Sequence, residues 1–238
     1  YFNRYYVPNN VAICMAGDFD PDKVVAIIDK YFGDWKKSDN LSRPEYAQVR
    51  ELTAPVDTTV VGLEAENLMM GWKTEGAASY QADTLDVISN MLSNGKAGLF
   101  DLDLNTPMKV QSAGAGSMGM TDYGQFILVG SPKQGQSLEE VRKLMLAEIE
   151  KLKKGQFADN LLPAVVNNMK LSYYRSLQSN SSRADKFVDA FINGQKWSDQ
   201  VTRLDRISKM TRQQIIDFAN RFFLNNYVTV FKRQGNDT

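Results

Sequence analysis

The chain has 238 residues, with 28 Lys plus Arg and 28 Asp plus Glu, so its formal net charge at neutral pH is zero. A balanced charge with 43% hydrophobic residues is ordinary for a globular protein. It argues against a nucleic-acid-binding protein, which needs a basic surplus to contact phosphates. No apolar run approaches the roughly 18 residues that span a bilayer, so no membrane segment is expected.

The sequence contains no histidine and one cysteine, Cys14. Zinc sites draw on imidazole, thiolate and carboxylate ligands, and hydrolytic sites commonly use histidine as a general base. Asp18, Asp20 and Asp22 alternate and could suggest a metal site. Pro21 follows Asp20 directly, however, which is typical of a helix start with Asp20 as its N-cap. We therefore assign this chain no metal, no cofactor and no catalytic residue.

The first 36 residues are predicted to contain a strand at Val11–Gly17 and a helix that ends at Gly33. The segment from Asn3 to Ile13 aligns with the segment from Asn220 to Thr229, with one gap at Pro8. Both copies carry Asn-Arg, two aromatic residues, Asn-Asn and an apolar run. Because the second copy closes a domain, we interpret residues 1–36 as the terminal strand–helix unit of a preceding domain.

Residues 37–51 are polar, contain Pro44 and show neither a helical nor a strand period, so they are predicted to be a linker. A second domain, residues 52–238, follows. Its first half is predicted to form a strand pair, a helix, a small-residue loop, a short helical run and two more strands. The ranges are 58–64, 68–74, 79–92, 93–98, 99–105, 110–120 and 125–131.

The segment 110–120 is rich in Gly, Ala and Ser, which also occurs in phosphate-binding loops. It lacks the Gly-Lys-Ser/Thr ending of such a loop, so a strand packed closely under a covering helix is favoured. The second half is predicted to be helical, with capping boxes at Ser137 with Glu140 and at Thr211 with Gln214. Its helices are expected at 137–154, 159–177, 182–192, 198–208 and 211–223, and a final strand at 227–232.

Arginines on these late helices are most simply solvent-exposed, although Arg175, Arg183, Arg203 and Arg206 could instead contact a partner domain. Strands are few and segregated from helices, which indicates an α+β class. We expect a mixed, mainly antiparallel sheet covered by helices on one face.

Two clusters of residues resemble the pitrilysin/insulinase-like zinc metallopeptidases, which include the mitochondrial processing peptidases. The first is Tyr6-Val7-Pro8-Asn9-Asn10, then the strand, then Gly17-Asp18-Phe19-Asp20 and a helix ending Tyr31-Phe32-Gly33. The second is Leu92-Ser93-Asn94-Gly95 with Gly98-Leu99-Phe100, which is similar to that family's Gly-rich turn. The resemblance implies the LuxS/processing-peptidase-like metallohydrolase fold.

Members of this family are built from homologous units that enclose a chamber for peptides. One unit carries an inverted His-x-x-Glu-His zinc motif, and another often supplies an Arg and a Tyr seven residues apart. This sequence has no histidine, and Leu104 and Gln111 stand where the Arg and Tyr would fall. The resemblance therefore implies a non-catalytic domain that follows the zinc-bearing one, braces it and lines the chamber. Zinc is expected only in the parent protein, and an inactive scaffold or substrate-binding subunit is the alternative.

The loop residues Asn94, Gly95, Lys96 and Gly98 are the predicted substrate contact, with a plain turn as the alternative. The expected partners are the upstream zinc-bearing domain, further homologous domains and a peptide substrate. The apolar strand from Val11 to Met15 would lack its own sheet and could pair in a homodimer. The bacterial cell envelope or periplasm and the cytoplasm are both compatible with the sequence.

Overall fold

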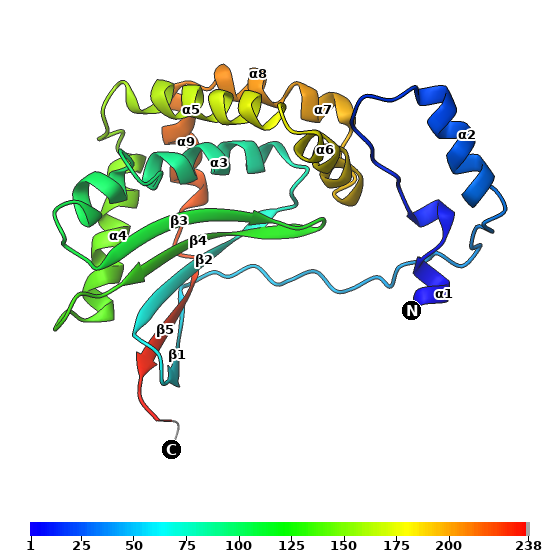
Figure 1. Cartoon of the computed structure of the whole chain (residues 1–238). Helices are drawn as coiled ribbons and strands as arrows, with labels where there is room; N and C mark the ends of the chain where they lie inside the picture. Colours follow the sequence, from blue (N-terminus) through cyan, green and yellow to red (C-terminus); the bar gives the residue numbers. More distant parts are fainter. Residues whose placement is uncertain (237–238) are drawn as a thin grey trace.

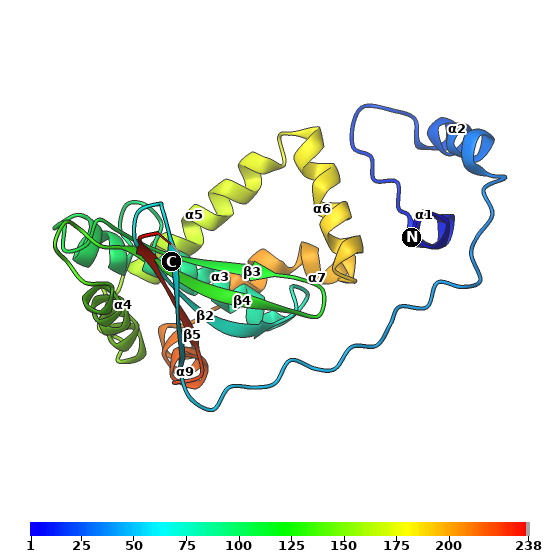
Figure 2. The same cartoon turned by 90° about the horizontal axis from the view of Figure 1, so that it is seen from below.

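The computed structural model describes residues 1–236, and five strands in this range form one sheet in the order β1-β5-β2-β4-β3. The strands are β1 (Val56–Gly62), β2 (Asn67–Glu75), β3 (Ser112–Gly119), β4 (Tyr123–Ser131) and β5 (Val228–Gln234). Helices lie over one face of this sheet (Figures 1 and 2). The predicted α+β class, with a mainly antiparallel sheet covered on one face, is confirmed.

The main helices of residues 52–236 are α3 (Tyr80–Leu92), α4 (Leu138–Lys153), α5 (Leu161–Ser176), α6 (Asn180–Ile192) and α9 (Arg212–Phe222). Shorter elements are α7 (Trp197–Val201), α8 (Arg203–Ser208) and η2 (Asp101–Asn105), a single π-helical turn. The opening segment holds α1 (Phe2–Tyr5), η1 (Pro8–Asn10) and α2 (Pro21–Phe32). Among the described residues, no helix is long and apolar enough to cross a membrane.

The last strand of the chain is an inner strand of the sheet. β5 runs parallel to β1 on one side, with Thr58 opposite Val230, and antiparallel to β2 on the other, with Met69 opposite Val230. β1 and β2 were predicted as a pair, and both strands exist. The predicted pairing between them is wrong, because β5 lies between them.

Strand alternation separates the core from the uncovered face of the sheet. On β2, Leu68, Met70 and Trp72 are buried, whereas Met69 between them is exposed. The Trp72 ring packs edge-on against Phe223, and its indole N–H donates to the Leu224 carbonyl at 3.1 Å. The buried side chains of β2 and β4 pack with those of α3, α4 and α9 in one core.

The Gly-, Ala- and Ser-rich segment forms strand β3, as predicted. It runs at the edge of the sheet beside α3, where the Ser89 hydroxyl donates to the Ala115 carbonyl at 3.1 Å. On the neighbouring strand, a Cβ at Gly130 would lie 2.6 Å from Val141 of α4. Small residues therefore let the helices approach the sheet closely.

Local capping signals account for most helix starts. The Asp20 carboxylate accepts from the Asp22 and Lys23 amides, so its N-cap role is confirmed. Thr211 and Gln214 form the predicted capping box. Ser137 caps α4 by accepting from the Glu140 amide, but only this half of its predicted box is formed among the described residues.

The single helix predicted at 198–208 is in fact two helices, α7 and α8, which meet at Thr202. Its hydroxyl donates to the Ser198 carbonyl at 2.8 Å, a back-bond that competes with regular helix geometry. The Arg206 guanidinium donates to the Asp199 carbonyl at 2.8 Å, which joins α8 to α7 across this break.

Arg203 and Arg206, two of the arginines predicted as possible partner contacts, instead form ion pairs with residues of the same chain. Both guanidinium groups bind the buried carboxylate of Asp83 on α3, at 2.7 and 2.9 Å. Arg203 also pairs with Asp86, where burial raises the carboxyl pKa and the Arg203 charge lowers it. These ion pairs fasten α8 to α3.

The opening segment stands apart from the sheet (Figure 1). The strand predicted at Val11–Gly17 is not formed: Val11 has extended dihedrals, but the segment has no neighbouring strand in the described chain. The Asn9 side chain exchanges two hydrogen bonds with the Ser38 backbone, at 2.9 and 3.1 Å. These bonds tie the opening segment to the linker, while no residue of α2 is buried.

Candidate functional site

The predicted substrate loop is a turn closed by its own side chains. Asn94 accepts from the Lys96 and Ala97 amides at 3.1 and 2.9 Å and donates to the Asn90 carbonyl at 2.9 Å. Asp101, which is 6% exposed, accepts from the amides of Asn94, Lys96 and Gly98 at 2.8, 3.2 and 3.1 Å. A carboxylate of the chain itself therefore fills the backbone concavity that a ligand would need.

The two glycines of this loop are explained by the fold. Gly95 has φ +77°, a conformation that side chains disfavour. A Cβ at Gly98 would lie 2.5 Å from the Leu92 carbonyl oxygen, so only glycine fits there. Gly95 and Lys96 are exposed, Asn94 is half-buried and Gly98 is buried. These contacts favour the plain turn, and substrate contact stays a prediction.

The loop continues into η2, whose side chains connect three elements. The side-chain amide of Asn105 bonds both backbone groups of Ala113, as a neighbouring strand would. It accepts from the Ala113 N–H at 2.7 Å and donates to the Ala113 carbonyl at 2.9 Å. Asp103 forms an ion pair with Lys151 of α4 at 2.8 Å. Asp101, Asp103 and Asn105 thus join the loop, α4 and the edge strand β3.

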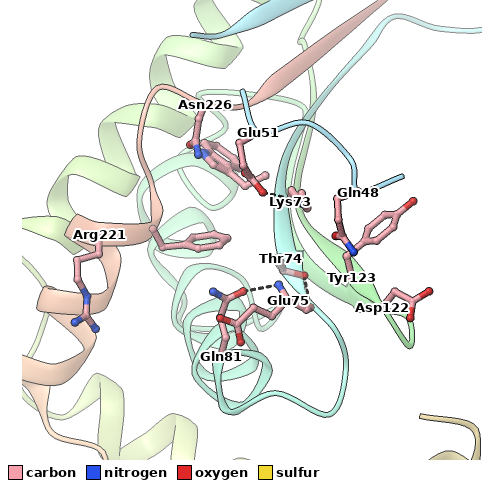
Figure 3. A pocket seen from close by; sticks show the side chains of 12 residues that line it. Gln48, Glu51, Lys73, Thr74, Glu75, Gln81, Asp122, Tyr123, Arg221 and Asn226 are labelled. Carbon is pink, nitrogen blue, oxygen red and sulfur yellow. Dashed lines mark hydrogen bonds and ion pairs between the residues drawn. The ribbon is translucent and has the colours of Figure 1, made fainter. Parts of the chain in front are cut away.

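A cavity of about 360 Å³ lies at the other end of α3, between the linker and the end of β2. Lys73 closes one side by donating to the Val49 carbonyl at 3.1 Å and pairing with Glu51 at 2.5 Å. Opposite this pair, the Glu75 amide donates to the Gln81 side chain at 2.8 Å (Figure 3). The length of α3, about 18 Å for its 13 residues, separates this cavity from the predicted loop.

Charged side chains of both signs line this cavity. They are Glu51, Glu75, Asp122, Lys73 and Arg221, and Lys73 is paired with Glu51. A second cavity of about 580 Å³ separates linker residues 44–49 from the turn between β3 and β4. The segment 37–51 was predicted to be a linker without regular secondary structure. Its contact with Lys73 could not be predicted from local sequence patterns, because the contacting residues are 22 or more positions apart.

The uncovered face of the sheet exposes several apolar side chains to solvent. Met69 (43% exposed) of β2 lies opposite Val129 (40% exposed) of β4 and beside Val230 of β5. Val56 and Val60 of β1 and Val228 of β5 extend it on the same side, as their register shows. Exposed apolar patches of this kind mark interaction surfaces.

The chain's residues do not fit a zinc site. Histidine is absent, Cys14 is the one thiol, and residues 1–236 bring together no group of three or more Cys, Asp or Glu side chains that could hold a metal ion. Zinc prefers nitrogen and sulfur ligands in a tetrahedral set. No catalytic step through a metal is derived for this chain.

Both a family model and a curated relative relate this chain to zinc peptidases of the M16 family. The family described as "Peptidase M16 inactive domain" matches residues 1–169. The "Zinc protease PqqE" of Helicobacter pylori is 26% identical over 196 residues, which are 81% of this chain and 44% of that protein. The chain thus spans less than half the length of this relative.

Solved structures share the fold. A protease from Helicobacter pylori superposes with a TM-score of 0.85 at 22% identity, over 92% of this chain and 54% of the other. A peptidase M16 inactive domain from Pseudomonas fluorescens superposes with a TM-score of 0.78 at 15% identity, over 93% of this chain and 53% of the other. The match to the family covers more than half of the sequence, and the resemblance noted from its motifs is confirmed. The chain belongs to the peptidase M16 inactive-domain family.

Proposed function

We propose that this chain is the non-catalytic part of a zinc-dependent metalloendopeptidase, and that it braces the zinc-bearing domain and lines the chamber that receives peptides. Membership of the inactive-domain family supports the non-catalytic role. The name of the Helicobacter pylori relative, a zinc protease more than twice as long as the matched segment, supports the peptidase context.

We propose that the uncovered face of the sheet forms part of the chamber wall. Its apolar centre, formed by Met69, Val129 and Val230, matches the apolar side chains that an unfolded polypeptide exposes. Methionine adapts to differently shaped partners, which suits a surface that receives varied sequences.

The opening segment supports the bracing role. Residues 1–36 are proposed to complete the sheet and helices of the zinc-bearing domain, to which residues 37–51 link the non-catalytic domain 52–238. The exposed side chains of Ile27 and Tyr31 on α2 would then pack inside that domain. The segment Val11 to Met15 would pair there as a strand, or across a homodimer.

The pairing of this segment can be tested by deleting residues 1–36. Loss of a dimer or a gain in solubility, measured by size-exclusion chromatography with light scattering, is the expected result. Unchanged oligomeric state and unchanged solubility would contradict a role for Val11–Met15 in assembly.

The chamber wall is tested on the full-length gene product with Val129→Glu. A carboxylate in the centre of the uncovered face should weaken binding of a labelled, permanently unfolded polypeptide at least about tenfold, as expected for the loss of one or two buried apolar contacts. Val61→Glu is the matched control, because Val61 is equally exposed but lies on the helix-covered side of the edge strand β1. Equal binding by both variants would refute the assignment of this face.

The alternative is an inactive scaffold or substrate-binding subunit, which the absence of catalytic residues in this chain equally supports. Zinc content and peptide cleavage by the full-length gene product separate the two. Stoichiometric zinc with cleavage supports the peptidase, and polypeptide binding without zinc or cleavage supports the scaffold.

A further inference from the structure

A buried carboxyl group on α4 has one oxygen without a hydrogen-bond partner. Glu148 is 3% exposed, and its Oε1 accepts from the Lys151 ammonium at 2.8 Å. Its Oε2 is fully buried and has no partner among residues 1–236. An ionised oxygen in this position is costly, because it has lost water and gained no donor.

The side chain that faces Glu148 is also acidic. Asp103 of η2 accepts from the same Lys151 ammonium at 2.8 Å, so both carboxyl groups contact one ammonium. The charged groups around the pair are Lys151 and, near Asp103, Lys109. One ammonium in contact with both carboxylates would leave a net negative charge on this cluster, in which Glu148 is buried and Asp103 and Lys151 are partly exposed.

The two carboxyls respond oppositely to this environment. Burial is the main cause that raises the pKa of Glu148, whereas the hydrogen bond from Lys151 is the main cause that lowers the pKa of Asp103. The hydrogen bond to Asp103 raises the pKa of Lys151 in turn. The pair therefore favours an ionised Asp103, an ionised Lys151 and a neutral Glu148.

We propose that Glu148 retains a proton in the folded protein and donates it to the Asp103 carboxylate, so that the pair acts as a proton-dependent clamp between α4 and η2. The proton turns an oxygen of Glu148 into a donor and gives Asp103 a second bond. Release of the proton replaces this bond by repulsion between two carboxylates.

The turn η2 connects the clamp to the loop at 94–98 and to the edge strand β3. Asp101 of the same turn holds the amides of Asn94, Lys96 and Gly98, and Asn105 holds both backbone groups of Ala113 on the edge strand. Loosening η2 on α4 would therefore loosen the loop at 94–98 and the start of β3 together. This inference does not depend on the proposed peptidase role.

The direction of the pH dependence follows from Glu148. Its pKa in the folded protein lies above the ordinary value of 4.5, so its stabilising contribution is complete below that value. The contribution is lost as the pH rises through the raised pKa of the folded state. The clamp is closed in mild acid and opens toward neutral and alkaline pH.

The test is amide hydrogen exchange of the full-length gene product across pH 5 to 8, after correction for the intrinsic pH dependence of exchange. The amides of Asn94, Gly98 and Ala113 should exchange progressively faster in the wild type, and this acceleration should be lost in Glu148→Gln, whose neutral amide donates permanently. Glu150→Gln is the matched control on the same helix, because Glu150 is exposed and forms a comparable i,i+3 pair with Lys153. Glu150→Gln should behave like the wild type.

A carbon-13 titration of the Glu148 carboxyl in the wild type provides a test that needs no folded Gln variant. The midpoint should lie above the ordinary carboxyl range, and Asp103→Asn should shift it downward because one cause of the raised pKa is removed. A wild-type midpoint in the ordinary range, or amide exchange at Asn94 and Ala113 with the same pH dependence in Glu148→Gln, would overturn the proposal.

Discussion

Replacing Asp101 by alanine would remove the group on which the loop at 94–98 is built. One buried carboxylate oxygen accepts three backbone amides there, at 2.8 to 3.2 Å. Without it, the Gly98 amide loses its partner in a fully buried position. The Asn94 and Lys96 amides lie nearer the surface and can bind water instead.

The expected cost follows from these differences in burial. A hydrogen bond to a charged group contributes about 1.5–3 kcal/mol, and an unsatisfied buried donor costs about 1–3 kcal/mol. Water can replace two of the three bonds at Asp101, so the sum is far below three full contributions. We expect Asp101→Ala to lower the free energy of unfolding by about 3 kcal/mol, and Asp101→Asn by about half as much because one acceptor oxygen remains.

The measurement is urea denaturation followed by circular dichroism, with the m-value required to stay constant. Asp122→Ala serves as the control, because Asp122 is exposed at the turn between β3 and β4 and should change stability by less than about 0.5 kcal/mol. A loss below about 1 kcal/mol for Asp101→Ala would refute the view that this carboxylate organises the loop.

Gly98→Ala should destabilise the protein by about 1–3 kcal/mol in the same urea assay, because the new Cβ would clash with the Leu92 carbonyl oxygen. Gly116→Ala is the control, and it should be neutral or stabilise the protein by up to about 1 kcal/mol, because a Cβ there has no neighbouring atom within 4 Å. Equal effects of the two substitutions would contradict the packing argument. Arg203→Met should raise the pKa of Asp86 further above its ordinary value of 3.8, because burial remains and the opposing charge is lost. Stability should then fall more steeply than in the wild type as the pH rises above 4, and parallel pH–stability curves would show that Arg203 does not act on Asp86.

The sequence predicted the features that short segments determine. Asp20 before Pro21, and Thr211 with Gln214, marked helix starts correctly because a cap depends on residues within one turn. The family motifs at Tyr6–Asn10 and Leu92–Phe100 identified the family because they are also local.

The remaining features depend on contacts between distant residues. Nothing near β1 and β2 indicates that Val230 will lie between Thr58 and Met69, more than 160 residues away in sequence. The glycines of the loop at 94–98 predicted a flexible contact site. In the structure, Asp101 binds the Gly98 amide, and the Leu92 carbonyl oxygen leaves no room for a side chain at Gly98.

The position of β5 also has a consequence for biosynthesis. A ribosome releases the first strands of this sheet long before Val228–Gln234 has left its exit tunnel, yet that final strand fills the gap between β1 and β2. Until Val228–Gln234 has been synthesised, β1 has no neighbour and β2 has one open side, so the nascent sheet must be kept from pairing with other chains. Native pairing of β1 therefore has to wait for residues 228–234, and a chain that lacks these residues would leave β1 without its neighbour.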